Sequence, residues 1–163
     1  MKRFLILLTV VAAAATPAHA EFRAGTAIVD VTPEILPVLI NGGMYTRSSD
    51  KIKTRVHARA IAFTDDNEKL AIVVVDSCMM TRDVLDEVKT LAAQRTGIAA
   101  DRILISATHS HTAPSSMGCL CTDADPEYVP FLRNLLVEAI DKAHSNMVPA
   151  QIGFAKRNAA EFT

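Results

Sequence analysis

Two histidines separated by one serine stand just past the middle of the chain, in the stretch ILISATHSHTAPSS of residues 103–116. If the extended geometry of the apolar run continues through them, the two-residue period of a strand places His109 and His111 on one face, a few ångströms apart. Neutral imidazole is a common zinc ligand, so the pair could hold a metal ion, or one metal ion and one substrate group. The alternative is an ordinary polar exit from a strand, and the spacing by itself favours neither interpretation.

An acidic residue directly follows a second apolar run. Asp76 comes immediately after LAIVVV, residues 70–75. Its carboxylate could orient a metal-bound histidine through the second ring nitrogen or contact a substrate, and the alternative is a turn or helix-capping role. Ser115 and Ser116 are interpreted as polar loop residues, because no Gly-x-Ser-x-Gly sequence surrounds them.

The apolar pattern predicts an α/β fold. Apolar residues fall at helical spacing over residues 82–96 and Gly97 ends the pattern, while a second helix is expected from Asp125 and Pro126 onward. Strands are expected over residues 24–31, 56–63, 70–75, 103–106 and 151–155. Because a helix connects the third strand to the fourth, these two should be parallel neighbours in a layered mixed sheet with helices.

This arrangement also predicts where a site should form. LAIVVV is apolar on both faces and should lie in the middle of the sheet. Ligands of such sheets gather outside the carboxyl ends of the strands. Asp76 and the histidine pair both follow strands at that edge, so we expect them near one another.

The first 20 residues have the pattern of a secretory signal peptide. Lys2 and Arg3 precede the apolar residues 4–15, and Ala18-His19-Ala20 suits a signal peptidase. A membrane anchor would need about 20 apolar residues, and Pro17 interrupts this run earlier. We therefore expect no transmembrane segment and a secreted or periplasmic protein that begins near Glu21.

Charge and cysteine content restrict the partners. Without Lys2 and Arg3 the remaining residues carry 15 basic and 18 acidic side chains, a formal charge of −3, so no basic footprint for nucleic acid exists. Small molecules or uncharged lipids are the expected partners. A lone Cys-x-Cys has no second pair with which to build a structural zinc site. The three cysteines are therefore interpreted as small hydrophobic residues with at most one disulfide, namely Cys78, Cys119 and Cys121.

Four segments together resemble a known family: GTAIVDVTP, ARA, VVVDS and TGIAADRILISATHSHTAP. From about Gly25 to about Ala155 the chain is similar to the N-terminal part of the neutral/alkaline non-lysosomal ceramidases, in a divergent bacterial branch. The resemblance implies an α/β domain with a bound zinc ion and cleavage of the amide of N-acylsphingosine. It implies that His109 is a Zn²⁺ ligand and that His111 hydrogen-bonds the polar head of a lipid amide substrate.

The chain also departs from that family. Thr112-Ala113-Pro114-Ser115-Ser116 stands where active members have a Ser-Gly-Pro-Gly type of turn, and Lys53 stands about where the family often has a histidine. The family's remaining metal ligands and its serine follow the matching region. The resemblance therefore predicts an incomplete N-terminal part of a larger catalytic domain, residues 21–163, which is inactive by itself. The alternative is a non-catalytic envelope binding module or a decayed member of the family.

Overall fold

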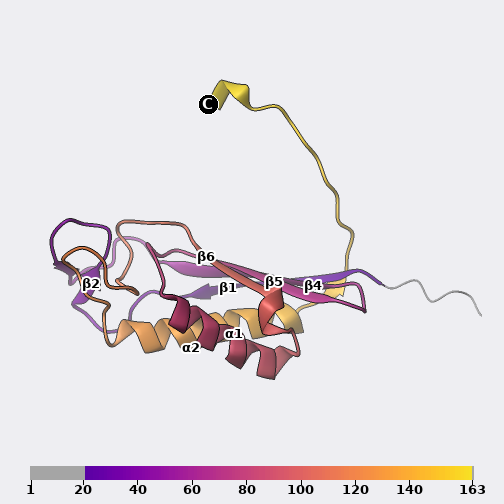
Figure 1. Ribbon diagram of the computed structural model, residues 1–163, viewed down its shortest axis with the longest axis horizontal. Helices are drawn as coiled ribbons and strands as arrows, with labels where there is room; N and C mark the ends of the chain where they lie inside the picture. The colour runs from indigo at the N-terminus through magenta and orange to yellow at the C-terminus, as the bar shows by residue number, and fades with distance from the viewer. Residues whose placement is uncertain (1–20, 163) are drawn as a thin grey trace, which may run out of the picture.

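The computed structural model describes residues 21–162 as a five-stranded sheet with two helices packed on one face (Figure 1). The predicted signal peptide lies outside these residues. The strands are β1 (Arg23–Asp30), β2 (Val38–Ile40), β3 (Arg47–Ser49), β4 (His57–Thr64), β5 (Lys69–Val75), β6 (Ile103–Ala107) and β7 (Val148–Pro149). The helices are α1 (Arg82–Thr96) and α2 (Tyr128–Ser145), with short 3₁₀ turns at Ala100–Arg102 and Ala160–Phe162. Among the described residues no helix is long and apolar enough to cross a membrane.

The sheet has the order β6-β5-β4-β1-β7, and the predicted parallel pair is confirmed. β5 and β6 run parallel, with Ala71 opposite Ile103 and Val75 opposite Ala107. β4 pairs antiparallel with both β5 and β1. β5 is an interior strand, as its apolar run predicts, and the mixed α/β architecture is the one expected from the sequence.

The helices bury one face of the sheet. Small side chains on β4, at Ala58, Ala60 and Ala62, are buried under them. At Gly25 of β1 the helix lies very close to the strand, because a Cβ there would lie 2.2 Å from the carbonyl oxygen of Ala143 in α2. The opposite face is open in the described residues and carries exposed apolar side chains, namely Ile28, Ile61, Val74 and Leu104.

Local signals explain the helix ends. The hydroxyl of Thr81 accepts a hydrogen bond from the amide of Val84 at the start of α1, and Gly97 ends the helix at φ 69°, in the left-handed region. The start of α2 was predicted too early, because the helix begins at Tyr128. The carboxylate of Asp125 nevertheless accepts hydrogen bonds from the amides of Glu127 and Tyr128 at 3.1 and 3.0 Å, so it stabilises the helix entrance from just outside.

The last predicted strand is wrong. The sheet ends instead at β7, whose two residues pair with Arg23 and Ala24 of β1. Residues 151–159 form no strand and extend away from the body of the molecule (Figure 1). Their apolar side chains Ile152 and Phe154 are exposed, so alternation there does not reflect burial against a sheet.

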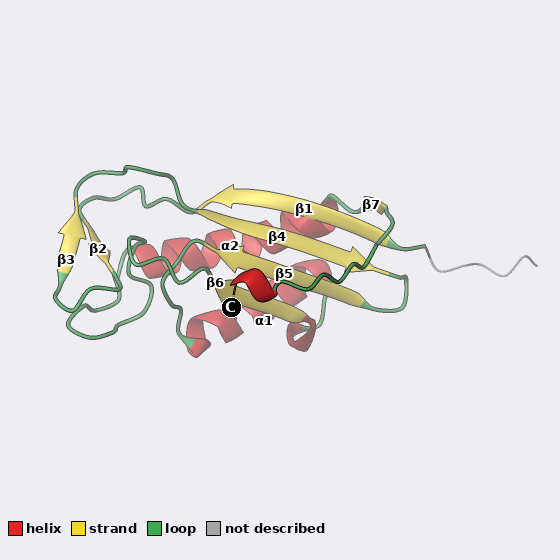
Figure 2. Ribbon diagram, turned by 90° about the horizontal axis from the view of Figure 1, so that it is seen from above, coloured by secondary structure: helices red, strands yellow, loops and turns green. Residues whose placement is uncertain are grey.

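The loops that follow β5 and β6 lie at one end of the sheet, beside the small β2–β3 hairpin (Figure 2). The hairpin is tied to the segment after the histidines, because Ile40 forms a bridge with Pro114 and the amide of Ser115 donates to the carbonyl of Leu39 at 2.8 Å. Polar residues after β5, after β6 and in the hairpin therefore meet at this edge.

Candidate metal centre

The extended geometry of β6 does not continue through the histidines, so the predicted strand alternation is wrong. β6 ends at Ala107, and His109 has φ 62°, in the left-handed region. Hydrogen bonds on both sides hold this turn: the amide of Thr108 donates to the carbonyl of Val75, and that of Ser110 to the carbonyl of Ser77. The turn still brings the two imidazoles together.

The rings of His109 and His111 lie edge to face, with centroids 4.8 Å apart and planes inclined by 76°. Nδ1 of His109 is 3.0 Å from the carbonyl oxygen of Cys78. A carbonyl oxygen only accepts, so in the neutral tautomer that makes this hydrogen bond Nδ1 carries the proton and Nε2 has the lone pair. A hydrogen bond from the other ring nitrogen to a backbone carbonyl is the usual way in which a metal-binding histidine is oriented.

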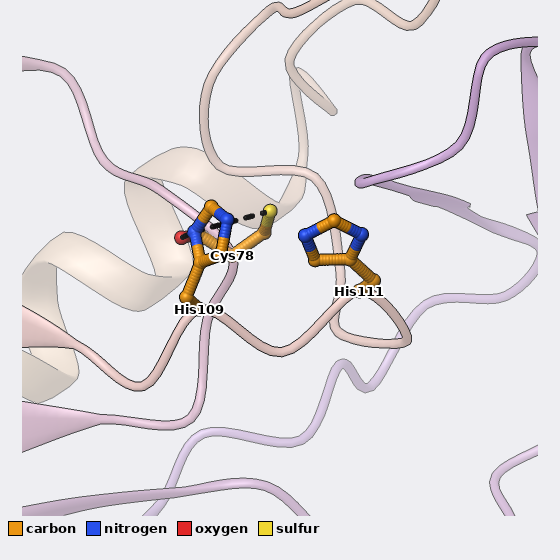
Figure 3. A group of neighbouring side chains, drawn as sticks. All are labelled: Cys78, His109 and His111. Atoms are coloured by element: carbon orange, nitrogen blue, oxygen red, sulfur yellow. Dashed lines mark hydrogen bonds between the residues drawn. The ribbon is translucent and has the colours of Figure 1, made fainter. Parts of the chain in front are cut away.

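Cys78 adds a third possible metal ligand beside the two imidazoles. Its side chain is 2% exposed, and its Sγ lies between the two imidazoles (Figure 3). One ligand atom from each of Cys78, His109 and His111 lies within 4.8 Å of the others. Burial raises the pKa of the Cys78 thiol, and nearby Cys119 raises it further. The thiol is therefore protonated at neutral pH in the absence of a metal ion.

Cys78 was expected to be a small hydrophobic residue and was not predicted as a ligand. Its place three residues beyond β5, at the edge where Asp76 also lies, is the one signal that pointed to it. The other two cysteines are different: Cys119 is half-buried, Cys121 is exposed, and neither belongs to the donor group. All three are free thiols in the structure.

The β2–β3 hairpin positions His111. Gly42, at φ 87°, packs directly against it, since a Cβ there would be 2.5 Å from Cγ of His111. Arg47 donates a hydrogen bond to the carbonyl of His111. The preceding Asn41 is buried, and its side chain donates to Oγ of Ser115 at 3.2 Å. No hydrogen bond to either ring nitrogen of His111 is present among residues 21–162, so both stay available to a ligand.

Asp76 lies at the predicted edge, but among the described residues its carboxylate contacts the ring of neither His109 nor His111; the imidazole that it approaches is that of His57, whose Nδ1 is 3.9 Å from Oδ2. Its carboxylate accepts hydrogen bonds from the guanidinium of Arg59 at 2.8 Å and from the amide of His57 at 3.0 Å. Burial raises the pKa of Asp76, but these hydrogen bonds and the charge of Arg59 outweigh it, and the net pKa is below its ordinary value. Asp76 is therefore a carboxylate that anchors the start of β4.

A cavity of about 810 Å³ opens beside the histidine turn. Asp76, Thr108, Ser110 and Thr112 line it from the sheet edge, and the segment 47–56 closes the other side. The predicted substrate contact of Asp76 is compatible with this position. The hydroxyls of Thr108, Ser110 and Thr112 add polar groups of the kind that orient a ligand in a pocket.

The two serines after the histidines are structural, as the sequence analysis proposed. Ser115 and Ser116 are 0% and 2% exposed. The hydroxyl of Ser116 donates to the carbonyl of Met79 at 2.7 Å, and that of Ser115 to the carbonyl of Asp123 at 2.8 Å. They join the loops around the centre and offer no accessible nucleophile.

The comparisons with known proteins agree with this architecture. Residues 22–162 match the family described as neutral/alkaline non-lysosomal ceramidase, N-terminal. The chain belongs to this family. It is 27% identical over 143 residues to neutral ceramidase A of Dictyostelium discoideum, which covers 81% of this chain and 20% of that protein.

Two solved structures have the same fold. The neutral ceramidase of Pseudomonas aeruginosa superposes with a TM-score of 0.68 at 21% identity, and a ceramidase complexed with C2 does so with 0.68 at 20% identity. Each match covers 80% of this chain and 22% of the other. The resemblance seen in the sequence is thus confirmed, and the chain corresponds to a partial N-terminal region about a fifth as long as these relatives.

Proposed function

We propose that this chain is part of an exported zinc-dependent amide hydrolase that cleaves N-acylsphingosine or a related lipid amide. The observation that carries the proposal is the orientation of His109, whose Nδ1 lies 3.0 Å from the Cys78 carbonyl oxygen while its ring lies edge to face with a second imidazole. Membership of the ceramidase family supports the reaction class. Because the chain spans about a fifth of its relatives' length, the activity is proposed for a polypeptide that contains it.

The donor chemistry fits zinc. Imidazole nitrogen and thiolate sulfur are the ligands that Zn²⁺ favours, and a catalytic site keeps one position open. When bound, the ion supplies a Lewis acid that polarises the amide carbonyl and lowers the pKa of water. His109 has the oriented lone pair that a ligand requires, while His111 has two uncommitted ring nitrogens and suits a hydrogen bond to the substrate's polar head.

The remaining polar groups would orient the substrate. Asp76 keeps its charge because Arg59 stabilises it, so it accepts hydrogen bonds from hydroxyl or amide donors that enter the cavity. Thr108 and Thr112 line the same space. These groups bind and orient, and the further ligands and the nucleophile would come from the rest of the enzyme.

The test is hydrolysis of a fluorescent N-acylsphingosine by the polypeptide read from the extended gene. We expect turnover that a chelator removes and added Zn²⁺ restores, and that His109→Ala abolishes. His144→Ala is the matched control, since His144 lies in the last turn of α2 and outside the donor group. A protein that binds the lipid amide without any turnover, with or without zinc, would favour the non-catalytic binding module.

Export is tested separately. Residues 1–20 predict cleavage before Glu21, so protein expressed with its own N-terminus should be found outside the cytoplasm with a mass that begins near Glu21. Cytoplasmic protein that retains Met1 would show that this part of the proposal is wrong.

A further inference from the structure

Cys78 is more than a small buried residue at the edge of the sheet. Its carbonyl oxygen and its Sγ both face one imidazole, at 3.0 Å and 4.0 Å from Nδ1 of His109. The thiol points to the space between His109 and His111, not into the apolar core (Figure 3). A buried sulfur directed at two imidazoles is positioned to bind a metal ion together with them.

Hydrogen bonds hold the backbone around Cys78 in place, as a metal ligand requires. The amide of Ser77 donates to the carbonyl of Val75 at 2.8 Å, and the hydroxyls of Ser77 and Ser116 both reach the carbonyl of Met79. The carbonyl of Ser77 also accepts from Ser110 inside the histidine turn. Cys78 and His109 are therefore fixed relative to each other by hydrogen bonds on both sides of each residue.

We propose that Cys78 is a thiolate ligand of the same ion as His109, so that the centre in this chain is a mixed nitrogen–sulfur site. The inference rests on the proposed metal site at His109. As the metal–sulfur bond forms, the S–H proton passes to solvent and no oxidant or reductant takes part. Thiolate ligation is stronger than a water ligand, so Cys78 gives the N-terminal region metal affinity beyond that of one histidine.

Cobalt(II) is a direct probe, because a thiolate bound to it produces charge-transfer absorption in the near ultraviolet whereas imidazole alone does not. We expect this band when Co²⁺ is added to the purified chain. Cys78→Ser should remove the band and weaken Co²⁺ binding on the order of tenfold or more, since even residues that only orient a ligand typically contribute 10- to 100-fold. Cys121→Ser, an exposed thiol outside the donor group, should keep the band.

Two further measurements separate this inference from the proposed function. Equilibrium dialysis of wild type and His109→Ala reports whether the ion binds at the histidine, whatever its other ligands. Cadmium-113 resonance of the wild-type complex reports sulfur ligation with no substitution, which keeps the test valid if Cys78→Ser does not fold.

The outcomes are distinct. Metal that binds at His109 without the cobalt band and without a sulfur-shifted cadmium signal would overturn the role of Cys78 and leave the histidine site standing. A band that persists in Cys78→Ser would also overturn it. The wild-type polypeptide read from the extended gene, if it binds no cobalt or cadmium at all, would refute both the ligand role of Cys78 and the proposed metal site.

Discussion

Replacement of His109 and replacement of His111 are predicted to have different effects on zinc content and activity. In the enzyme that contains this chain, replacing His109 should remove most of the bound zinc together with activity. Replacing His111 with alanine should leave the zinc and lower activity. The different roles are those that the family resemblance implies, and the contact of Nδ1 of His109 with the Cys78 carbonyl supports a ligand role for His109.

The structure sets the size of each effect. His111→Ala removes one hydrogen bond to the substrate, which corresponds to about 1–3 kcal/mol, or roughly 5- to 150-fold in kcat/KM. His109 has φ 62°, where asparagine is tolerated better than alanine. His109→Asn is therefore the better variant, because it keeps the turn while removing the imidazole. A loss of zinc in this variant reports the ligand and not the backbone.

The assay is metal analysis of each purified variant beside its kinetics, with circular dichroism to confirm folding. Full zinc in His109→Asn together with zinc loss in His111→Ala would reverse the two roles. Full zinc in both variants would mean that the histidine turn is not a metal site.

The remaining predictions concern stability, measured by urea unfolding. Gly25→Ala should destabilise by about 1–3 kcal/mol or more, because its Cβ would lie 2.2 Å from a carbonyl oxygen of α2; Gly153→Ala has nothing within 4 Å and is the control. Leu136→Ala should cost about 2–5 kcal/mol, since this side chain is 0% exposed. Hydrogen bonds from Thr32 lower the pKa of Asp30 from 3.8 to about 2, with help from Arg55, so the carboxylate stabilises the fold above pH 3.8 and this contribution disappears as the pH falls through about 2. Asp30→Asn should therefore differ from wild type near neutral pH and converge with it in acid; a constant difference would contradict the assignment.

The parts of the fold that could be predicted are those whose residue pattern is compatible with a single kind of secondary structure. Helical spacing over residues 82–96 followed by Gly97 gave α1 with its observed bounds, and the apolar run before Asp76 gave an interior strand. The strand expected over residues 151–155 failed because alternation of apolar residues needs a partner strand, which the sequence does not show. The start of α2 was misplaced because Asp125 can cap the first amides without being the N-cap residue itself.

The candidate site could be predicted only in part. The histidine pair was identified from its position after a buried strand, but strand alternation was the wrong reason for its proximity, since His109 turns out of the extended region. Asp76 was placed at the correct edge, but its hydrogen bonds with Arg59 and the His57 amide could not be predicted, because one sequence does not show which strands pair. Cys78 was missed because a thiol at a strand end has the same pattern as a small core residue.

The left-handed backbone of His109 is the feature that joins these observations. A non-glycine residue in that region costs roughly 1–2 kcal/mol, and it persists only where the surroundings impose it. The amides of Thr108 and Ser110, on both sides of His109, donate to the carbonyls of Val75, the last residue of β5, and of Ser77 just beyond it. The β2–β3 hairpin holds the other end of the turn through Gly42 and His111. The parallel strands and the hairpin thus act from opposite sides on one strained residue, and the result is an imidazole whose free nitrogen stands beside a second imidazole and a buried thiol.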